Sequence, residues 1–213
     1  MEELFSQRYG DINFENTKSD IETIAESSFS FDEKLFNECP DWISLRGYFQ
    51  TEKYFKHIED EIKGDFSFKD EIFEPCNEML SGLDSPVSLH IRRTDYVTNP
   101  NHTALGLNYY EKALKEFDKT STVLVFSDDP EWCNQQEIFS EDRFLIAEGN
   151  SNYIDLCLMT LCSKHIIANS SFSWWGAWLS EQEKVVAPSG WFKGSNNEHL
   201  DTKDIIPEDW MVI

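Results

Sequence analysis

The sequence has few basic residues. Lysine and arginine together number 18, against 40 aspartates and glutamates, which gives a formal net charge of −22. A surface of this sign repels the phosphates of nucleic acids and the head groups of anionic lipids, so binding to nucleic acid through bulk charge is disfavoured. An anionic ligand would therefore need the few cations to gather at one place.

The chain also lacks a long apolar run, a leader pattern and a cysteine framework. Its longest uncharged run, residues 165–180, contains Asn169 and several serines, whereas a spanning helix needs about 20 mostly apolar residues. The first residues, Met-Glu-Glu-Leu-Phe, have neither the basic nor the apolar region of a signal peptide. The five cysteines form no Cys-x-x-Cys pair, so we expect reduced thiols, no metal site and a cytoplasmic protein.

What the chain does contain is the composition of a folded protein, with 40% hydrophobic and 14% aromatic residues. The acidic first part predicts helices at 32–37 and 52–62 on either side of a strand at 43–49, with Thr51 capping the second helix. A weaker helix over 70–79 is expected to break near Pro75. The turn residues at 81–86 then suggest two regions, 1–84 and 85–213.

The second region alternates short apolar segments with amphipathic ones, which predicts a parallel, doubly wound α/β sheet. The expected strands are 87–91, 122–126, 144–147, 165–168 and 184–187, and the expected helices are 107–117, 130–139, 153–163 and 173–182. Ligands of such sheets bind beyond the carboxyl ends of the strands. The residues that follow each strand are therefore the candidates for a site.

The first of these strands ends in His90-Ile91-Arg92-Arg93-Thr94-Asp95. Guanidinium groups bind phosphate oxygens in a bidentate manner and stay charged when desolvated, so Arg92, together with Arg93, could hold a phosphate or diphosphate. An equally good interpretation is that Arg93 pairs with Asp95 at the rim of the sheet. His90 alternates with apolar neighbours and could be a hydrogen-bonded core histidine.

The second strand is followed by Asp128 and Asp129. A pair of acids at this place could hold Mg²⁺, bond a sugar hydroxyl or cap the next helix. We favour the cap for Asp129, because Pro130 follows it at a position that suits the first turn of a helix. A metal site has no evident third ligand.

The fourth strand runs into Asn169, Ser170, Ser171 and Ser173 at the predicted start of a helix. Hydroxyls and backbone N–H groups at a positive helix end suit a phosphate, although Ser171 or Ser173 could simply be N-caps. Asp155 lies in an otherwise apolar helix and either accepts from a ligand or lies on a solvated face. Together, these cations, hydroxyls and acids describe a nucleotide-diphosphate pocket without a glycine-rich loop.

Trp174 and Trp178 in the same segment lie four residues apart and predict one buried helix face. Gly176 and Ala177 between them are small, so we expect the helix to approach the sheet closely.

These segments resemble the α-1,2-fucosyltransferases of glycosyltransferase family 11. The resemblance covers roughly residues 45–192, and it rests on six segments: His90–Val97, Phe126–Trp132, Asp155–Met159, Ile166–Leu179, Val185–Pro188 and Trp191–Phe192. The sequence Gly47-Tyr48-Phe49-Gln50 is also similar to that family.

The resemblance implies a GT-B-like fold and an inverting, metal-independent transfer of L-fucose from GDP-fucose to the 2-hydroxyl of a galactoside in a glycan. Region 85–213 would be the Rossmann-like domain that binds GDP-fucose, and region 1–84 a partial acceptor-side region. No cofactor is implied, and the expected partners are the donor and a galactose-terminated acceptor. Peripheral contact with a membrane that carries the acceptor stays open, as does the oligomeric state.

The resemblance also implies roles for individual residues. Arg92 matches an arginine on the β-phosphate of GDP, and Arg93 and Asp95 match its essential neighbours. The remaining matches, all on the substrate-binding side, are His90 and Asp155 near guanine and ribose, the acid pair Asp128 and Asp129, the phosphate-side segment Asn169, Ser170, Ser171 and Ser173, and the weaker match Tyr110.

The sequence departs from the family pattern in two places. Thr94 stands where the family usually has glycine, and no Gly-Gly-x-Gly-Asn-Gln segment precedes Gly47. We therefore expect part of the acceptor-side domain to be absent.

Three alternatives to fucosyl transfer stay open: another sugar-nucleotide glycosyltransferase, a nucleotide- or glycan-binding pseudoenzyme without turnover, and an α/β interaction module without nucleotide affinity.

Overall fold

The computed structural model describes residues 21–193 and 201–213, and they divide into two units. Within the described residues, one unit comprises 21–67 and 201–209, and the other comprises 68–193 and 210–213. The division falls after Ser67 rather than at the turn over 81–86. The helix between these two places packs against the larger unit, and so belongs to it.

That helix is α3 (Asp70–Leu80), which contacts α6 (Asn152–Thr160). Its buried residues are Ile72 and Cys76. The expected break near Pro75 is wrong, because α3 continues through this proline. Pro75 removes one hydrogen bond from the helix, and the burial of the apolar face compensates for that loss.

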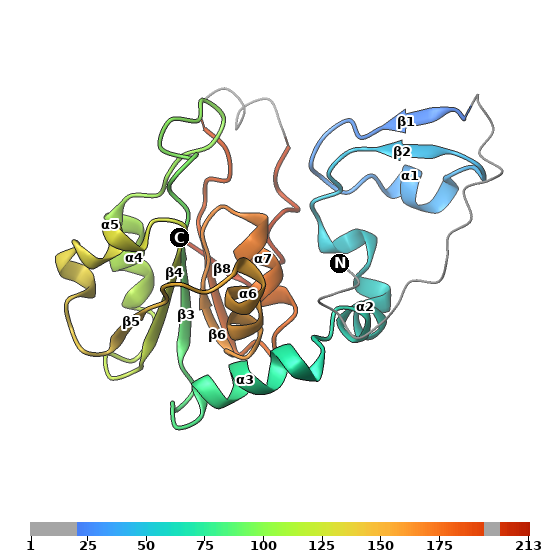
Figure 1. The fold of residues 1–213 in the computed structure, drawn as a ribbon. Coiled ribbons are helices and arrows are strands. Elements are labelled where there is room, and N and C mark those ends of the chain that lie inside the picture. Colours follow the sequence, from blue (N-terminus) through green and yellow to red (C-terminus); the bar gives the residue numbers. More distant parts are fainter. Residues whose placement is uncertain (1–20, 194–200) are drawn as a thin grey trace. The chain divides into compact units, whose positions relative to one another are not determined.

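The larger unit is built on a sheet of six parallel strands in the order β5-β4-β3-β6-β7-β8 (Figure 1). This confirms the predicted parallel α/β fold. The strands at 87–91 and 184–187 were predicted with their observed bounds, three others differ by one or two residues at an end, and β8 was not predicted. The strands are β3 (Val87–Ile91), β4 (Val123–Ser127), β5 (Phe144–Ile146), β6 (Lys164–Ile166), β7 (Lys184–Ala187) and β8 (Met211–Val212).

Helices connect these strands as in a doubly wound sheet. Helices α6 and α7 pack against each other on one face (Figure 1). The right-handed crossovers from β3 to β4 and from β4 to β5 place α4 and α5 on the other face. The bounds are α4 (Leu107–Leu114), α5 (Pro130–Asn134), a 3₁₀ turn η3 (Glu137–Phe139) and α7 (Ser171–Trp178).

The sheet is the core of this unit. All five residues of β3 are buried, as expected for a strand covered on both faces. Trp174 and Trp178 are buried and stacked, with ring centroids 6.1 Å apart, which confirms the predicted apolar face of α7. We expected Gly176 to let α7 approach the sheet, but it lets α7 approach α6 instead. A Cβ at Gly176 would lie 2.9 Å from Met159 of α6.

The smaller unit contains a pair of parallel strands and short helices, β1 (Thr23–Ala25), α1 (Glu33–Glu38), β2 (Ser44–Arg46), η1 (Glu52–Tyr54), η2 (Lys56–Ile58) and α2 (Glu59–Asp65). The predicted cap at Thr51 is confirmed, because its side chain accepts from the N–H of Lys53. The single helix expected over 52–62 is instead two 3₁₀ turns followed by α2, so the spacing of apolar residues was helical but the backbone was not continuous.

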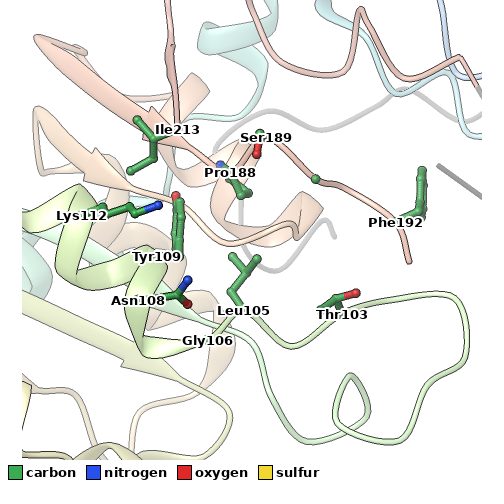
Figure 2. Close-up of a pocket in the computed structure, with 11 residues that line it drawn as sticks. Thr103, Leu105, Gly106, Asn108, Tyr109, Lys112, Pro188, Ser189, Phe192 and Ile213 are labelled. Carbon is green, nitrogen blue, oxygen red and sulfur yellow. The ribbon is translucent and has the colours of Figure 1, made fainter. Parts of the chain in front are cut away.

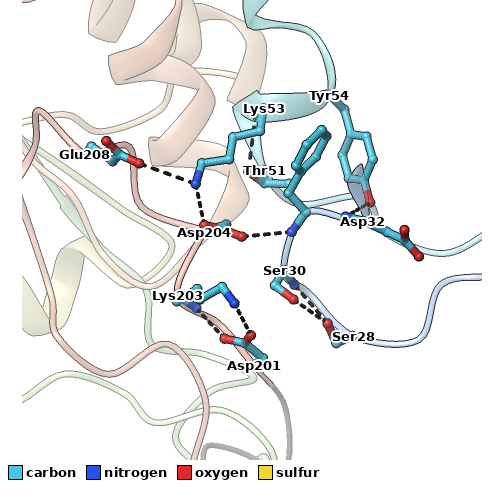
Figure 3. A network of polar contacts seen from close by, with 11 residues as sticks. Ser28, Ser30, Asp32, Thr51, Lys53, Tyr54, Asp201, Lys203, Asp204 and Glu208 are labelled. Carbon is cyan, nitrogen blue, oxygen red and sulfur yellow. Dashed lines mark hydrogen bonds and ion pairs between the residues drawn. The ribbon is translucent and has the colours of Figure 1, made fainter. Parts of the chain in front are cut away.

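Residues 201–209 belong to this unit through a network of polar contacts (Figure 3). The carboxylate of Asp204 accepts from the ammonium of Lys53 at 2.7 Å and from the N–H of Phe31 at 2.9 Å. Asp204 is 8% exposed, and the ion pair with Lys53 is one cause of the lowered pKa of its carboxyl group, against the opposing effect of burial. The network therefore ties the chain's late segment to its early one.

None of the helices in residues 21–193 and 201–213 combines the length and the apolar character that crossing a bilayer requires.

Candidate functional site

The order of the strands reverses between β3 and β6, and this place is the switch point of the sheet. From β3 the chain moves to β4 and β5 on one side, and from β6 it moves to β7 and β8 on the other. In sheets of this kind a crevice opens beyond the carboxyl ends of the two strands at the reversal. Those ends are Ile91 and Ile166, so Arg92 and the segment 169–171 lie where this rule places a ligand.

Two contacts join these strand ends directly. The hydroxyl of Tyr96 donates to the carbonyl oxygen of Asn169 at 3.2 Å. The rings of His90 and Phe172 lie 5.5 Å apart, centroid to centroid. The arginine segment and the serine segment therefore adjoin at one edge of the sheet, as the sequence predicted.

Arg92 is the more accessible of the two arginines. Its guanidinium pairs with Asp95 at 2.7 Å and with Asp128 at 3.2 Å, and it lies over the ring of Tyr96. The side chain remains 35% exposed. A group that is oriented by two carboxylates and still reaches solvent can accept an anionic ligand without a rearrangement of the backbone.

Arg93 is packed into the fold. Its guanidinium carbon lies 3.7 Å from the centre of the Trp132 ring, and its Nε donates to Asp129 at 3.2 Å. The interpretation that Arg93 pairs with Asp95 is wrong, because Asp95 pairs with Arg92. Stacking and an ion pair together fix the arginine segment against α5.

Asp128 holds this segment in place. One carboxylate oxygen accepts from the N–H of Arg93 at 2.8 Å, and the other accepts from the N–H of Thr94 at 3.1 Å and from its hydroxyl. The same carboxylate pairs with Arg92. Its hydrogen bonds and its charge are thus directed at the backbone and side chains that follow β3, which is a positioning role.

Asp129 is the N-cap of α5. Its side chain accepts from the N–H of Trp132 at 3.2 Å, which confirms the predicted cap. Pro130 begins the helix, as expected. The second carboxylate oxygen of Asp129 bonds Arg93, so the acid joins the start of α5 to the arginine segment.

The start of α7 carries the serines. Its N-cap is Ser170, not Ser171 or Ser173, and no side-chain hydrogen bond caps the helix within the described residues. Ser170 is 7% exposed, whereas Ser171, the first helical residue, is exposed. Ser173 donates to the carbonyl of Ser170. The first N–H groups of α7 are therefore available to an anion.

Asn169 is 1% exposed and braces the loop before α7. Its side-chain amide donates to the carbonyls of Trp191 at 2.9 Å and Thr103 at 3.2 Å. Its Oδ1 is buried without a hydrogen-bond partner among the described residues. The two side-chain hydrogen bonds of Asn169 therefore indicate a structural role in this loop.

His90 lies in β3 and is 4% exposed. Burial lowers the pKa of its imidazole to about 4, with Asp128 raising and Arg92 lowering it to smaller extents. The ring is therefore neutral at pH 7. Its Nδ1 has no hydrogen-bond partner among the described residues, so the expected role near a nucleotide stays a prediction.

Tyr110 and Asp155 are placed differently from each other. Tyr110 is fully buried in α4, and burial raises the pKa of its hydroxyl, which favours a packing role. Asp155 lies in the first turn of α6 and is half-buried rather than fully solvated. Burial raises the pKa of its carboxyl group, and an amide hydrogen bond from Asn150 at 3.0 Å opposes that change. Direct contact of either residue with a ligand stays a prediction.

The residues that the structure describes contain no group of three or more histidine, cysteine and acidic side chains placed to hold a metal ion.

A recess of about 310 Å³ opens where β7 ends and α4 begins. Figure 2 shows the side chains that surround it. Its polar lining includes Asn108, Lys112 and Ser189, and its apolar lining includes Leu105 and Phe192. Sequence reasoning missed these residues, because Asn108 and Lys112 have the spacing of an ordinary solvated helix face.

The sequence matches the model of glycosyl transferase family 11 over residues 19–213. It is 36% identical to an alpha-1,2-colitosyltransferase of Escherichia coli, over 87% of this chain and 68% of that protein. It is 35% identical to the O-antigen biosynthesis glycosyltransferase WbnK of Escherichia coli, over 73% and 57%. It is 27% identical to galactoside alpha-(1,2)-fucosyltransferase 1 of Bos taurus, over 68% and 45%. The chain thus spans between about half and two thirds of the lengths of these relatives.

Proposed function

The chain belongs to glycosyl transferase family 11, and on this basis we propose that it transfers L-fucose from GDP-fucose to the 2-hydroxyl of a galactoside in a glycan. The transfer inverts the anomeric carbon and needs no metal. The observation that carries the proposal is that the segment containing Arg92 adjoins the uncapped start of α7 at the switch point of the sheet. The names of the relatives indicate the linkage and the sugar class.

The donor's diphosphate is the part that this geometry suits. As the acceptor's 2-hydroxyl oxygen forms a bond to C1 of fucose, the bond from C1 to the phosphate oxygen breaks and its electron pair leaves with GDP. The hydroxyl proton leaves to a base or to water. Negative charge grows on the β-phosphate, and Arg92 with the N–H of Ser171 would stabilise it. Donors held in place before the reaction contribute about 3 kcal/mol each.

The way the nearby acids are used supports the proposed metal independence. The carboxylates of Asp128 and Asp129 are bonded to the arginine segment and to the start of α5. A divalent cation at either acid would have to displace these bonds. Arginine and backbone N–H donors can stabilise the negative charge instead, since the guanidinium stays charged and the backbone N–H does not titrate.

A second donor is favoured by one of the relatives. The protein at 36% identity is named as a colitosyltransferase, and colitose is L-fucose without its 3-hydroxyl. The diphosphate contacts proposed above do not involve the sugar ring. The same site could therefore serve GDP-colitose, and the choice between the two would depend on contacts to the 3-hydroxyl.

A donor panel tests the proposed function. The full chain is mixed with lactose and with GDP-fucose, GDP-colitose, GDP-mannose or UDP-galactose, in buffer that contains EDTA. We expect GDP-fucose or GDP-colitose to give an α-1,2-linked trisaccharide, identified by NMR, and the other donors to give none. Transfer from the other donors alone, loss of transfer in EDTA, or donor affinity without any transfer would contradict the proposal.

The contribution of the α7 N–H group can be measured with two variants of one residue. Ser171→Ala removes the hydroxyl, whereas Ser171→Pro removes the hydroxyl and the N–H group. Proline suits the first helical position, and the extended backbone of Ser170 (φ −140°, ψ 130°) is compatible with a following proline. We expect the proline variant to have a kcat/KM for the donor on the order of tenfold to a hundredfold below that of the alanine variant.

Circular dichroism and the melting temperature of both Ser171 variants serve as the control for folding. Equal kcat/KM values in two variants that melt alike would show that this N–H group does not contact the donor.

A further inference from the structure

The smaller unit contains a built turn that the proposed donor chemistry does not use. Strands β1 and β2 are parallel and end at Ala25 and Arg46 (Figure 1). Glu26 follows β1, and its carboxylate accepts from the N–H of Tyr48 at 2.7 Å and from the N–H of Phe49 at 3.0 Å. One acid thus fixes the backbone of the turn that follows β2.

Two features show that this turn is held against local preference. A Cβ at Gly47 would lie 2.4 Å from the Cβ of Glu26, so only glycine fits at this approach. Phe49 has φ +49°, in the left-handed region that a phenylalanine rarely adopts. Strain of this kind persists where the surrounding contacts over-determine the backbone, and it gathers at functional sites.

The turn presents Tyr48 to solvent. This side chain is 75% exposed, although its ring lies only 5.9 Å from that of Phe29, centroid to centroid. Beside it opens a recess of about 440 Å³, lined by residues 25–29 and 46–48. An exposed aromatic side chain that lines a recess is placed to cover a ligand.

The lining of the recess points to a neutral polar ligand. Its two charged groups, Glu26 and Arg46, balance each other, and both oxygens of Glu26 are already occupied by the turn. Arg46 makes no ion pair with another residue in the described parts of the chain, and the hydroxyl of Ser27 also lines the recess. An aromatic face with hydroxyl and guanidinium donors at its side matches a sugar ring, which has apolar C–H faces and hydroxyls at its rim.

We propose that this recess binds a galactose-containing unit of the acceptor glycan, with the Tyr48 ring against the C–H face of the sugar and Arg46 bonding its hydroxyls. The inference rests on the proposed function, because that function supplies a galactoside as the second substrate. Glu26 is a positioning residue here, since its contacts are with the turn.

Saturation-transfer NMR on the full chain with lactose tests the proposal. We expect saturation to pass from the protein to the galactose protons, and Tyr48→Ala to reduce this signal at least fivefold. Tyr48→Phe keeps the ring and should retain the signal. Trp42→Ala is the matched control, because Trp42 is also an exposed aromatic residue of this unit, at 84%, and does not line the recess.

Hydrolysis of GDP-fucose without an acceptor, measured in the same samples, separates this proposal from the proposed function. Hydrolysis without saturation transfer to lactose would overturn the recess proposal and leave the donor chemistry intact. Saturation transfer that depends on Tyr48 in a protein without hydrolysis or transfer would support the recess and contradict the proposed function. A wild-type signal in folded Tyr48→Ala, or loss of the signal in Trp42→Ala, would also overturn the recess proposal.

Discussion

Replacing Arg92 with alanine is expected to lower the kcat/KM for fucosyl transfer by about a thousandfold or more. Arg92 is the arginine at the switch point that keeps access to solvent, and two acids orient it toward one place. Without it, the charge on the leaving β-phosphate would be met by the start of α7 alone. Initial rates with GDP-fucose and lactose, at saturating concentrations of each in turn, measure the loss.

Arg92→Lys refines this prediction. A lysine keeps the charge but cannot form the paired hydrogen bonds of a guanidinium, so its rate should fall between those of the wild type and the alanine variant. Arg143→Ala is the matched control: Arg143 precedes β5, at the opposite end of the strands, and pairs with Glu141. Near-normal turnover in Arg92→Ala, or an equal loss in Arg143→Ala, would refute the role assigned to Arg92.

The sequence predicted the sheet because its strands are short apolar segments between amphipathic ones. It also predicted that the arginine and serine segments would adjoin, because residues after parallel strands meet at one edge whatever the details of packing. It could not separate the roles of Arg92 and Arg93. That distinction depends on two contacts. Trp132 stacks on the guanidinium of Arg93, and Asp95 pairs with Arg92.

The features that the sequence did not predict depend on contacts between distant residues. Asp204 binds Lys53 and Phe31 across about 150 to 170 positions of the chain, and no local pattern marks such a pair. Strands β1 and β8 have only three and two residues, too few to show a period. Gly176 was correctly interpreted as a site of close approach, but which element approaches depends on the packing of α6.

Asp128→Asn is expected to lower kcat/KM by about a hundredfold, although Asp128 is assigned no contact with the reacting atoms. The substitution keeps the shape of the side chain but removes its charge and one of its acceptors. The N–H groups of Arg93 and Thr94 would then share a weaker partner, and Arg92 would keep Asp95 alone. Thr94→Val, which removes only the hydroxyl bond, should cause a smaller loss.

A double-variant cycle decides whether Asp128 acts through Arg92. If it does, Asp128→Asn combined with Arg92→Ala should be nearly as active as Arg92→Ala alone, because the group that Asp128 positions is already gone. Losses that multiply would show that the acid contributes independently, as a direct ligand of the substrate would. Asp118→Asn is the control, because Asp118 is exposed and its side chain bonds Thr120 in the loop before β4. Its kcat/KM should stay at the wild-type value, and a fall there would mean that the assay reports general damage rather than the positioning of Arg92.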